Sequence, residues 1–158
     1  MSTATKRNIE AIYPLSPMQQ GMLFHSLLAP ESGVYVEQLS CTLRGSLDMA
    51  AFERAWQRAV ERHAVLRTAF AWRSSERPLQ VVQRQVALPI AVEDWRDRSH
   101  AEQQESFAAL RAAERARGFD LAKAPLTRLA LAQVADDAHC FVWTHHHILL
   151  DGWSLPLL

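Results

Sequence analysis

Three consecutive histidines at positions 145–147 follow a run of apolar, β-forming residues near the end of the sequence. The run from Cys140 to Thr144 predicts a buried strand, and the pair Asp151-Gly152 predicts a turn shortly after it. Every buried imidazole nitrogen needs a hydrogen-bond partner, so a histidine cluster at this place is costly unless it has a role. Histidine also exchanges protons near neutral pH. We therefore expect a rigid strand end that can carry proton chemistry.

The composition is that of a globular chain without a strong net charge. The 158 residues can bury a core as one domain, and 17 Lys and Arg balance 17 Asp and Glu. This balance gives no electrostatic argument for binding nucleic acid or an anionic membrane. No apolar run is long enough to span a bilayer, and residues 1–8 lack the apolar core of a signal peptide. Because Cys41 and Cys140 lie too far apart for a compact metal motif, we expect a reduced, cytoplasmic chain.

The spacing of apolar residues predicts a mixture of helices and strands. We expect residues 1–11 to form a flexible leader. Ser16 and Pro17 are typical of a helix start, and Pro30 ends that helix. The other expected elements are strands at 34–44, 66–72, 78–82, 88–95, 126–134 and 139–147, and helices that open at 46–48 and span 98–118. This order predicts an α/β fold, specifically an α+β two-layer sandwich with helices packed on a sheet.

The histidine segment carries a recognisable signature. His146-His147-x-x-x-Asp151-Gly152, followed by Trp153-Ser154, resembles the HHxxxDG motif of condensation domains from nonribosomal peptide synthetases. These domains belong to the chloramphenicol-acetyltransferase-like acyltransferases. The doubled histidine and the Asp-Gly pair make this signature more specific than a lone HxxxD pattern.

Other segments resemble further motifs of the same family. Residues 14–25, PLSPMQQGMLFH, resemble its first motif, in the form that accompanies a donor ending in a D-residue. Residues 62–70, RHAVLRTAF, match its second motif, RHxxLRTxF, and residues 119–121 and 125–128 look like its FDL…PLxR segment. The resemblance runs from Tyr13 to Leu158.

The resemblance implies a chloramphenicol-acetyltransferase-like lobe in which helices pack on a mixed sheet. Family members have two such lobes, with the active site in the cleft between them. We therefore expect residues 12–158 to be the N-terminal lobe and the C-terminal lobe to be missing. The chain alone is expected to be inactive.

The implied reaction is amide formation between two thioesters on carrier domains. His147 is the histidine that the resemblance places at the reaction centre, either as a base toward the attacking amine or as a group that orients it. Gly152 allows close backbone approach, and its N–H is a candidate donor to the developing oxyanion. The reaction requires no metal and no cofactor bound by this chain, because the substrates travel on phosphopantetheine arms.

The supporting residues have more specific expected roles. Asp151 either orients His147, as in a catalytic triad, or forms the ion pair with Arg67 that the family implies. We favour the ion pair, and we expect Arg67→Ala mainly to lower stability. Because neighbouring strand residues point to opposite faces, His145 shares the face of His147, and His146 has a supporting role on the other.

Several alternatives remain open at this level. The histidines could be a satisfied core cluster, or His145 and His147 could bind a metal, although zinc usually needs a third protein ligand. Relatives that epimerise their substrate also keep HHxxxDG, so an epimerisation domain is the alternative enzyme. A non-catalytic lobe that only binds carrier or neighbouring domains is the non-enzymatic alternative. In each case the expected partners are carrier domains, adjacent synthetase domains and the C-terminal lobe.

Overall fold

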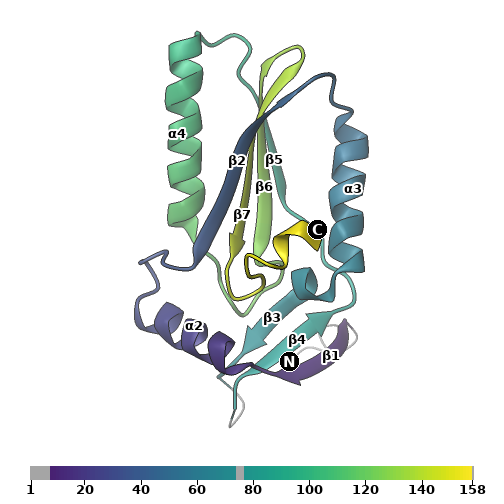
Figure 1. The fold of residues 1–158 in the computed structure, drawn as a ribbon, viewed down its shortest axis with the longest axis vertical. Helices are drawn as coiled ribbons and strands as arrows, with labels where there is room; N and C mark the ends of the chain where they lie inside the picture. Colours follow the sequence, from purple (N-terminus) through teal and green to yellow (C-terminus); the bar gives the residue numbers. More distant parts are fainter. Residues whose placement is uncertain (1–7, 74–76, 158) are drawn as a thin grey trace.

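The computed structural model describes residues 8–73 and 77–157, whose arrangement is shown in Figure 1. The α-helices are α2 (Pro17–Leu28), α3 (Met49–Arg62) and α4 (His100–Arg117). The strands are β1 (Ile9–Pro14), β2 (Val36–Arg44), β3 (Thr68–Ala71), β4 (Leu79–Gln83), β5 (Ile90–Asp94), β6 (Thr127–Ala135) and β7 (Ala138–His146). Short 3-10 helices are η1 (Ala64–Arg67) and η2 (Leu155–Leu157).

The larger sheet has the strand order β2-β7-β6-β5. β7 runs antiparallel to both β2 and β6, whereas β5 is parallel to β6, so the sheet is mixed. The strands expected at 126–134 and 139–147 form a hairpin, β6 and β7, and β5 lies at the edge of the sheet. β7 is central and buried over most of its length, which explains why its sequence is apolar without a polar alternation.

One face of this sheet is covered by α3, as predicted from its apolar stripe. The ring centroids of Trp56 and Trp143 lie 5.3 Å apart, and Phe52 packs edge-on against Phe141 at 5.9 Å. Such tilted aromatic pairs add to the free energy gained from apolar burial. The odd-numbered residues of β7 therefore face α3, and this face holds the main core.

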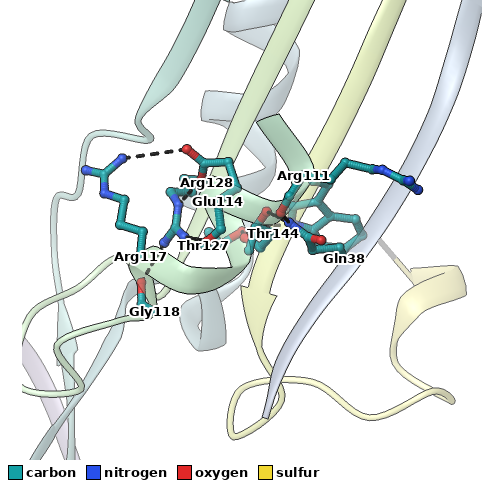
Figure 2. A network of polar contacts seen from close by, with 9 residues as sticks. Gln38, Arg111, Glu114, Arg117, Gly118, Thr127, Arg128 and Thr144 are labelled. Atoms are coloured by element: carbon teal, nitrogen blue, oxygen red, sulfur yellow. Dashed lines mark hydrogen bonds and ion pairs between the residues drawn. The ribbon is translucent and has the colours of Figure 1, made fainter. Parts of the chain in front are cut away.

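The opposite face is covered by α4, which Figure 1 shows on the other side of the sheet. Arg128 of β6 reaches the end of α4: it contacts the carboxylate and the backbone carbonyl of Glu114, and its Nη1 donates to the Gly118 carbonyl over 2.9 Å. Figure 2 shows this cluster together with Gln38, which donates to Thr144 Oγ1 over 3.2 Å. The last carbonyls of α4, which lack partners within the helix, are satisfied here by the arginine.

The smaller sheet has the order β1-β4-β3 and is antiparallel throughout. β3 and β4 are antiparallel neighbours, and residues 74–76 of the segment between them lie outside the described residues. α2 follows β1 and begins as predicted: Ser16 accepts from the backbone N–H of Gln19, and the Gln19 side chain accepts from the backbone N–H of Ser16.

Two local expectations need correction. Residues 1–7 of the expected leader lie outside the described residues, but Ile9–Pro14 is a strand paired with β4. The strand expected at 66–72 begins only at Thr68, because Ala64–Arg67 forms a 3-10 turn between α3 and the sheet. Each difference depends on packing partners that are distant in sequence.

The expected fold class is confirmed: an α/β fold with helices packed on a mixed sheet. The presence of α3 and α4 on opposite faces adds a third layer around the larger sheet. None of the helices among the described residues combines the length and apolar character needed to cross a membrane.

Candidate functional site

The three histidines lie where β7 leaves the larger sheet. The backbone N–H of His146 donates to the Leu126 carbonyl over 3.0 Å, and the backbone N–H of His147 donates to the Tyr35 carbonyl over 2.8 Å. The pairing with the neighbouring strands thus continues through the histidines, and the chain turns away immediately after them. The side chain of His147 is 29% exposed, whereas His145 is 3% exposed. His147 is therefore the most solvent-accessible histidine of the cluster.

His147 faces a carboxylate. Its Nδ1 lies 3.3 Å from Oε1 of Glu37 on β2, and Nε2 of His145 lies 3.7 Å from Oε2 of the same residue. The two histidines therefore share one side of the sheet, as the strand alternation predicts. Burial lowers the pKa of His145, and the Glu37 carboxylate opposes this shift.

His146 points to the other side and is fully enclosed. Its Nδ1 accepts from the backbone N–H of Ile148 over 3.2 Å, and its Nε2 lies 3.3 Å from the Ser26 hydroxyl. Because that hydroxyl donates to the Met22 carbonyl, it accepts from His146, so the imidazole is neutral and carries its proton on Nε2. The Phe119 ring stands edge-on to it. His146 thus joins α2 to the signature loop.

The stability of the fold is expected to depend on the protonation of His146. Burial, reinforced by its two histidine neighbours, lowers the pKa of His146 from its ordinary value of 6.5 to about 4. The unfolded chain then binds more protons than the folded chain between these values, so stability falls as the pH decreases from 6.5 toward 4. The contribution is up to about 1.4 kcal/mol per pH unit.

Urea unfolding of the chain and of a His146→Gln variant at several pH values measures this contribution. The unfolding free energy of the variant should change less steeply with pH, because carboxylate titrations are common to both proteins. Equal slopes for the two proteins would show that His146 does not titrate as its burial implies.

The Asp151-Gly152 turn lies directly after the buried residues 148–150. Asp151 is exposed and accepts from the backbone N–H of Ser154 over 2.9 Å and from its hydroxyl over 2.6 Å. These bonds lower the pKa of Asp151 and organise the start of η2. Gly152 is exposed, and a Cβ at this position would meet no atom of the described residues within 4 Å. The backbone at Gly152 is therefore open to a ligand.

The expected ion pair between Asp151 and Arg67 is not formed. Arg67 is 5% exposed and pairs instead with Glu10, whose Oε2 lies 2.5 Å from Nη1. Its Nε also donates to the Val60 carbonyl over 3.1 Å, and Nη1 contacts the Gln83 carbonyl. The reason is β1, whose first residues, 9–11, were expected to belong to a flexible leader. This strand brings Glu10 beside the guanidinium, and the hydrogen bond from Arg67 lowers the pKa of that carboxyl.

Replacing Arg67 by alanine is still expected to lower stability, now because two buried carbonyls lose their donor. The expected loss in unfolding free energy is about 2 kcal/mol or more. Urea unfolding measures it, and Glu10→Gln serves as the matched control, with a smaller loss because Glu10 is exposed and the carbonyls keep their donor. An Arg67→Ala variant with unchanged stability would contradict this assignment.

His25 contacts the Tyr35 hydroxyl over 2.9 Å. Across residues 8–73 and 77–157, no three His, Cys, Asp or Glu side chains are grouped in a way that could hold a metal ion. Trp56 packs against the core and Trp95 is 2% exposed, so both have structural roles.

Two hollows border the histidines. A cavity of about 220 Å³ lies beside His146, between the end of α2, the loop at residues 29–35 and the loop at residues 118–121. A wider hollow of about 510 Å³ runs along β2, the edge strand of the larger sheet, beside His145 and Glu37. The first hollow thus borders His146 of the signature, and the second borders His145, which directly precedes it.

Sequence reasoning missed Glu37, Ser26 and Tyr35 as neighbours of the signature. Glu37 lies in a predicted strand of mixed polarity, where a charged residue normally indicates the solvated face. The register that places it opposite His145 is set by the pairing of β2 with β7, two strands that are distant in the sequence, and no local pattern encodes that register.

Residues 9–158 match the model of a protein family described as Condensation domain. The chain is 47% identical over 152 residues to one of the linear gramicidin synthase proteins from Brevibacillus parabrevis, covering 96% of this chain and 3% of that protein. It is 39% identical over 158 residues to tyrocidine synthase 2 from the same organism, covering all of this chain and 4% of that protein.

Solved structures show the same fold. The starter condensation domain of rhizomide synthetase RzmA superposes with a TM-score of 0.83 at 26% identity, covering 94% of this chain and 36% of that chain. The four-domain nonribosomal peptide synthetase AB3403 superposes with a TM-score of 0.80 over 95% of this chain and 11% of that chain; at 18% identity it supports the fold alone.

Proposed function

Because this chain belongs to the condensation-domain family of nonribosomal peptide synthetases, we propose that it takes part in forming a peptide bond between two carrier-bound thioesters. The donor is a peptidyl or aminoacyl thioester and the acceptor is an aminoacyl thioester. The observation that carries the proposal is the position of His147. It is the reachable imidazole of the cluster, held at a strand end by the bond from its backbone N–H to Tyr35.

The chemistry follows from an imidazole beside an amine and a thioester. The acceptor amine attacks the donor carbonyl while His147 either accepts the proton of the amine or orients the amine for attack. The new C–N bond forms, the C–S bond breaks, and the departing sulfur takes up a proton to leave as the thiol. Gly152 offers its N–H to the donor carbonyl oxygen, which carries negative charge after the attack and before the C–S bond breaks. The space over Gly152 is open to such a group.

The partners proposed for this reaction are carrier domains with phosphopantetheine arms and the neighbouring synthetase domains. Multidomain synthetases among the relatives support this assignment. The chain spans 3–4% of the curated relatives named above and 36% of the solved starter condensation domain. We propose that the second lobe of such a domain closes the cleft over His147. A cytoplasmic location is part of the same proposal. The chain itself is proposed to bind no cofactor.

A donor that ends in a D-residue is the finer part of the proposal. It rests on the resemblance of residues 14–25 to the first motif of the corresponding subgroup. In the structure this segment contacts the signature loop, because Nε2 of Gln19 donates to the Ile148 carbonyl over 3.3 Å. A substitution in residues 14–25 can therefore alter the structure around His147.

A single-turnover assay tests the proposal with a complete condensation domain that includes this chain. Donor carriers loaded with a D- or an L-terminated dipeptide are mixed with a loaded acceptor carrier, and intact mass records the product. The tripeptidyl thioester should form, and faster from the D-donor. Equal rates would overturn the donor assignment alone. Absence of product would overturn the condensation proposal, and inversion of the donor residue, read by chiral analysis, would establish the epimerisation alternative.

A further inference from the structure

We propose that Glu37 is a positioning residue for His147: its carboxylate holds the imidazole with the proton on Nδ1 and leaves Nε2 free toward the substrate. The inference deepens the proposed function and rests on it. The contact that motivates it is the 3.3 Å distance between Oε1 of Glu37 and Nδ1 of His147.

The register of the larger sheet places this carboxylate. Glu37 of β2 is the direct partner of His145 in β7, and His147 lies two residues farther along the same face. Diagonal neighbours at this spacing are within reach of a long side chain. The backbone bond from His147 to the Tyr35 carbonyl extends the pairing of β2 and β7, so the imidazole and the carboxylate are held by one ladder.

No described residue forms a hydrogen bond with Nδ1 of His145 or Nδ1 of His147. Nδ1 of His145 and Nδ1 of His147 are both buried, and neither has a hydrogen-bond partner within the described part of the chain. The angle at His147 is not that of a formed hydrogen bond, although Glu37 is within 3.3 Å. Hydrogen bonds of catalytic groups are commonly long before the substrate binds and tighten in the complex.

The carboxylate favours one tautomer for an electrostatic reason. A proton on Nδ1 faces the negative oxygen, whereas a lone pair on Nδ1 would be repelled by it. With Nδ1 protonated, Nε2 presents its lone pair and can accept the proton of the attacking amine, as in triads where a carboxylate orients the histidine. His145 does not take this role: it is 3% exposed, and its contact with Glu37 is longer, at 3.7 Å.

The test compares Glu37→Gln with Glu105→Gln in the complete condensation domain that includes this chain. The control removes the same charge from an exposed position on α4. Glu37→Gln should lower kcat about tenfold or more while KM for the acceptor carrier stays unchanged, since only orientation is lost. Nitrogen NMR of the histidine side chains should show Nδ1-protonated His147 in the wild type and a mixture of tautomers in Glu37→Gln.

Assignment of the His147 signal comes from a His147→Gln variant. The inference is overturned if Glu37→Gln matches Glu105→Gln in kcat and leaves the tautomer unchanged. It is also overturned if kcat falls together with the melting temperature while the tautomer is unchanged, because that pattern indicates a structural role.

Failure of the proposed function gives a different pattern. If the wild-type domain forms no amide, condensation is refuted, and the tautomer measurement still decides on the contact with Glu37. If the wild-type domain is active and His147→Ala is inactive, a fully active Glu37→Gln variant refutes the positioning role alone.

Discussion

Replacing His147 with alanine is expected to slow amide formation by about a hundredfold to ten-thousandfold, the usual contribution of a positioned acid–base group. His147 is the accessible imidazole of the cluster, while His145 and His146 are enclosed, so no neighbour can replace it. The alanine variant should fold normally, because the side chain is partly exposed and the backbone bond to Tyr35 remains.

The measurement is the single-turnover assay with loaded donor and acceptor carriers, with the melting temperature as a check of folding. His100→Ala is a matched control, because this exposed histidine lies at the start of α4, on another element. A His147→Ala domain that retains the wild-type rate would show that the imidazole does not act in the reaction. A folded wild-type domain that binds carriers but forms no product would favour the non-catalytic alternative.

Replacing Arg128 with alanine is expected to lower the unfolding free energy by about 3–5 kcal/mol, because it leaves the largely buried carboxylate of Glu114 with only the exposed Arg117 beside it. The side chains of Arg128 and Glu114 are 7% and 14% exposed. The guanidinium also satisfies the Gly118 carbonyl and lies 4.2 Å from the centre of the Phe119 ring, so hydrogen bonding and packing are lost together.

Urea unfolding of the 158-residue chain measures this loss, and Arg117→Ala is the matched control. Arg117 also approaches Glu114, at 3.8 Å, but it is 68% exposed, and Figure 2 shows it on the outer side of the cluster. Its removal should cost less than about 0.5 kcal/mol, as is typical of surface pairs. Equal losses for the two variants would indicate that burial does not decide the strength of these contacts.

Local patterns in the sequence were sufficient for most of the secondary structure. Ser16 with Pro17 marks the start of α2, and the stripe that includes Phe52 and Trp56 marks the buried face of α3. These signals succeed because capping and helical periodicity act between residues at most a few positions apart. The signature motif identified the family for the same reason, since its residues are close in the sequence.

Long-range pairing determined what the patterns could not show. The segment at Ile9–Pro14 has too little apolar alternation to predict a strand, and it becomes one by pairing with β4. That pairing gives Arg67 its counter-ion, Glu10, in place of Asp151. For an arginine with several donors, the partner is whichever acceptor the fold brings within reach, and the spacing along the chain does not specify it.

The same distinction applies to the candidate site. The sequence by itself predicted His147 as the reactive residue and His146 as its support, because motif and strand alternation are local. Only the tertiary structure placed Glu37 against His147, through the register of β2 on β7. A shift of one residue would move that carboxylate to the other face of the sheet, so its position depends on the packing of the whole sheet.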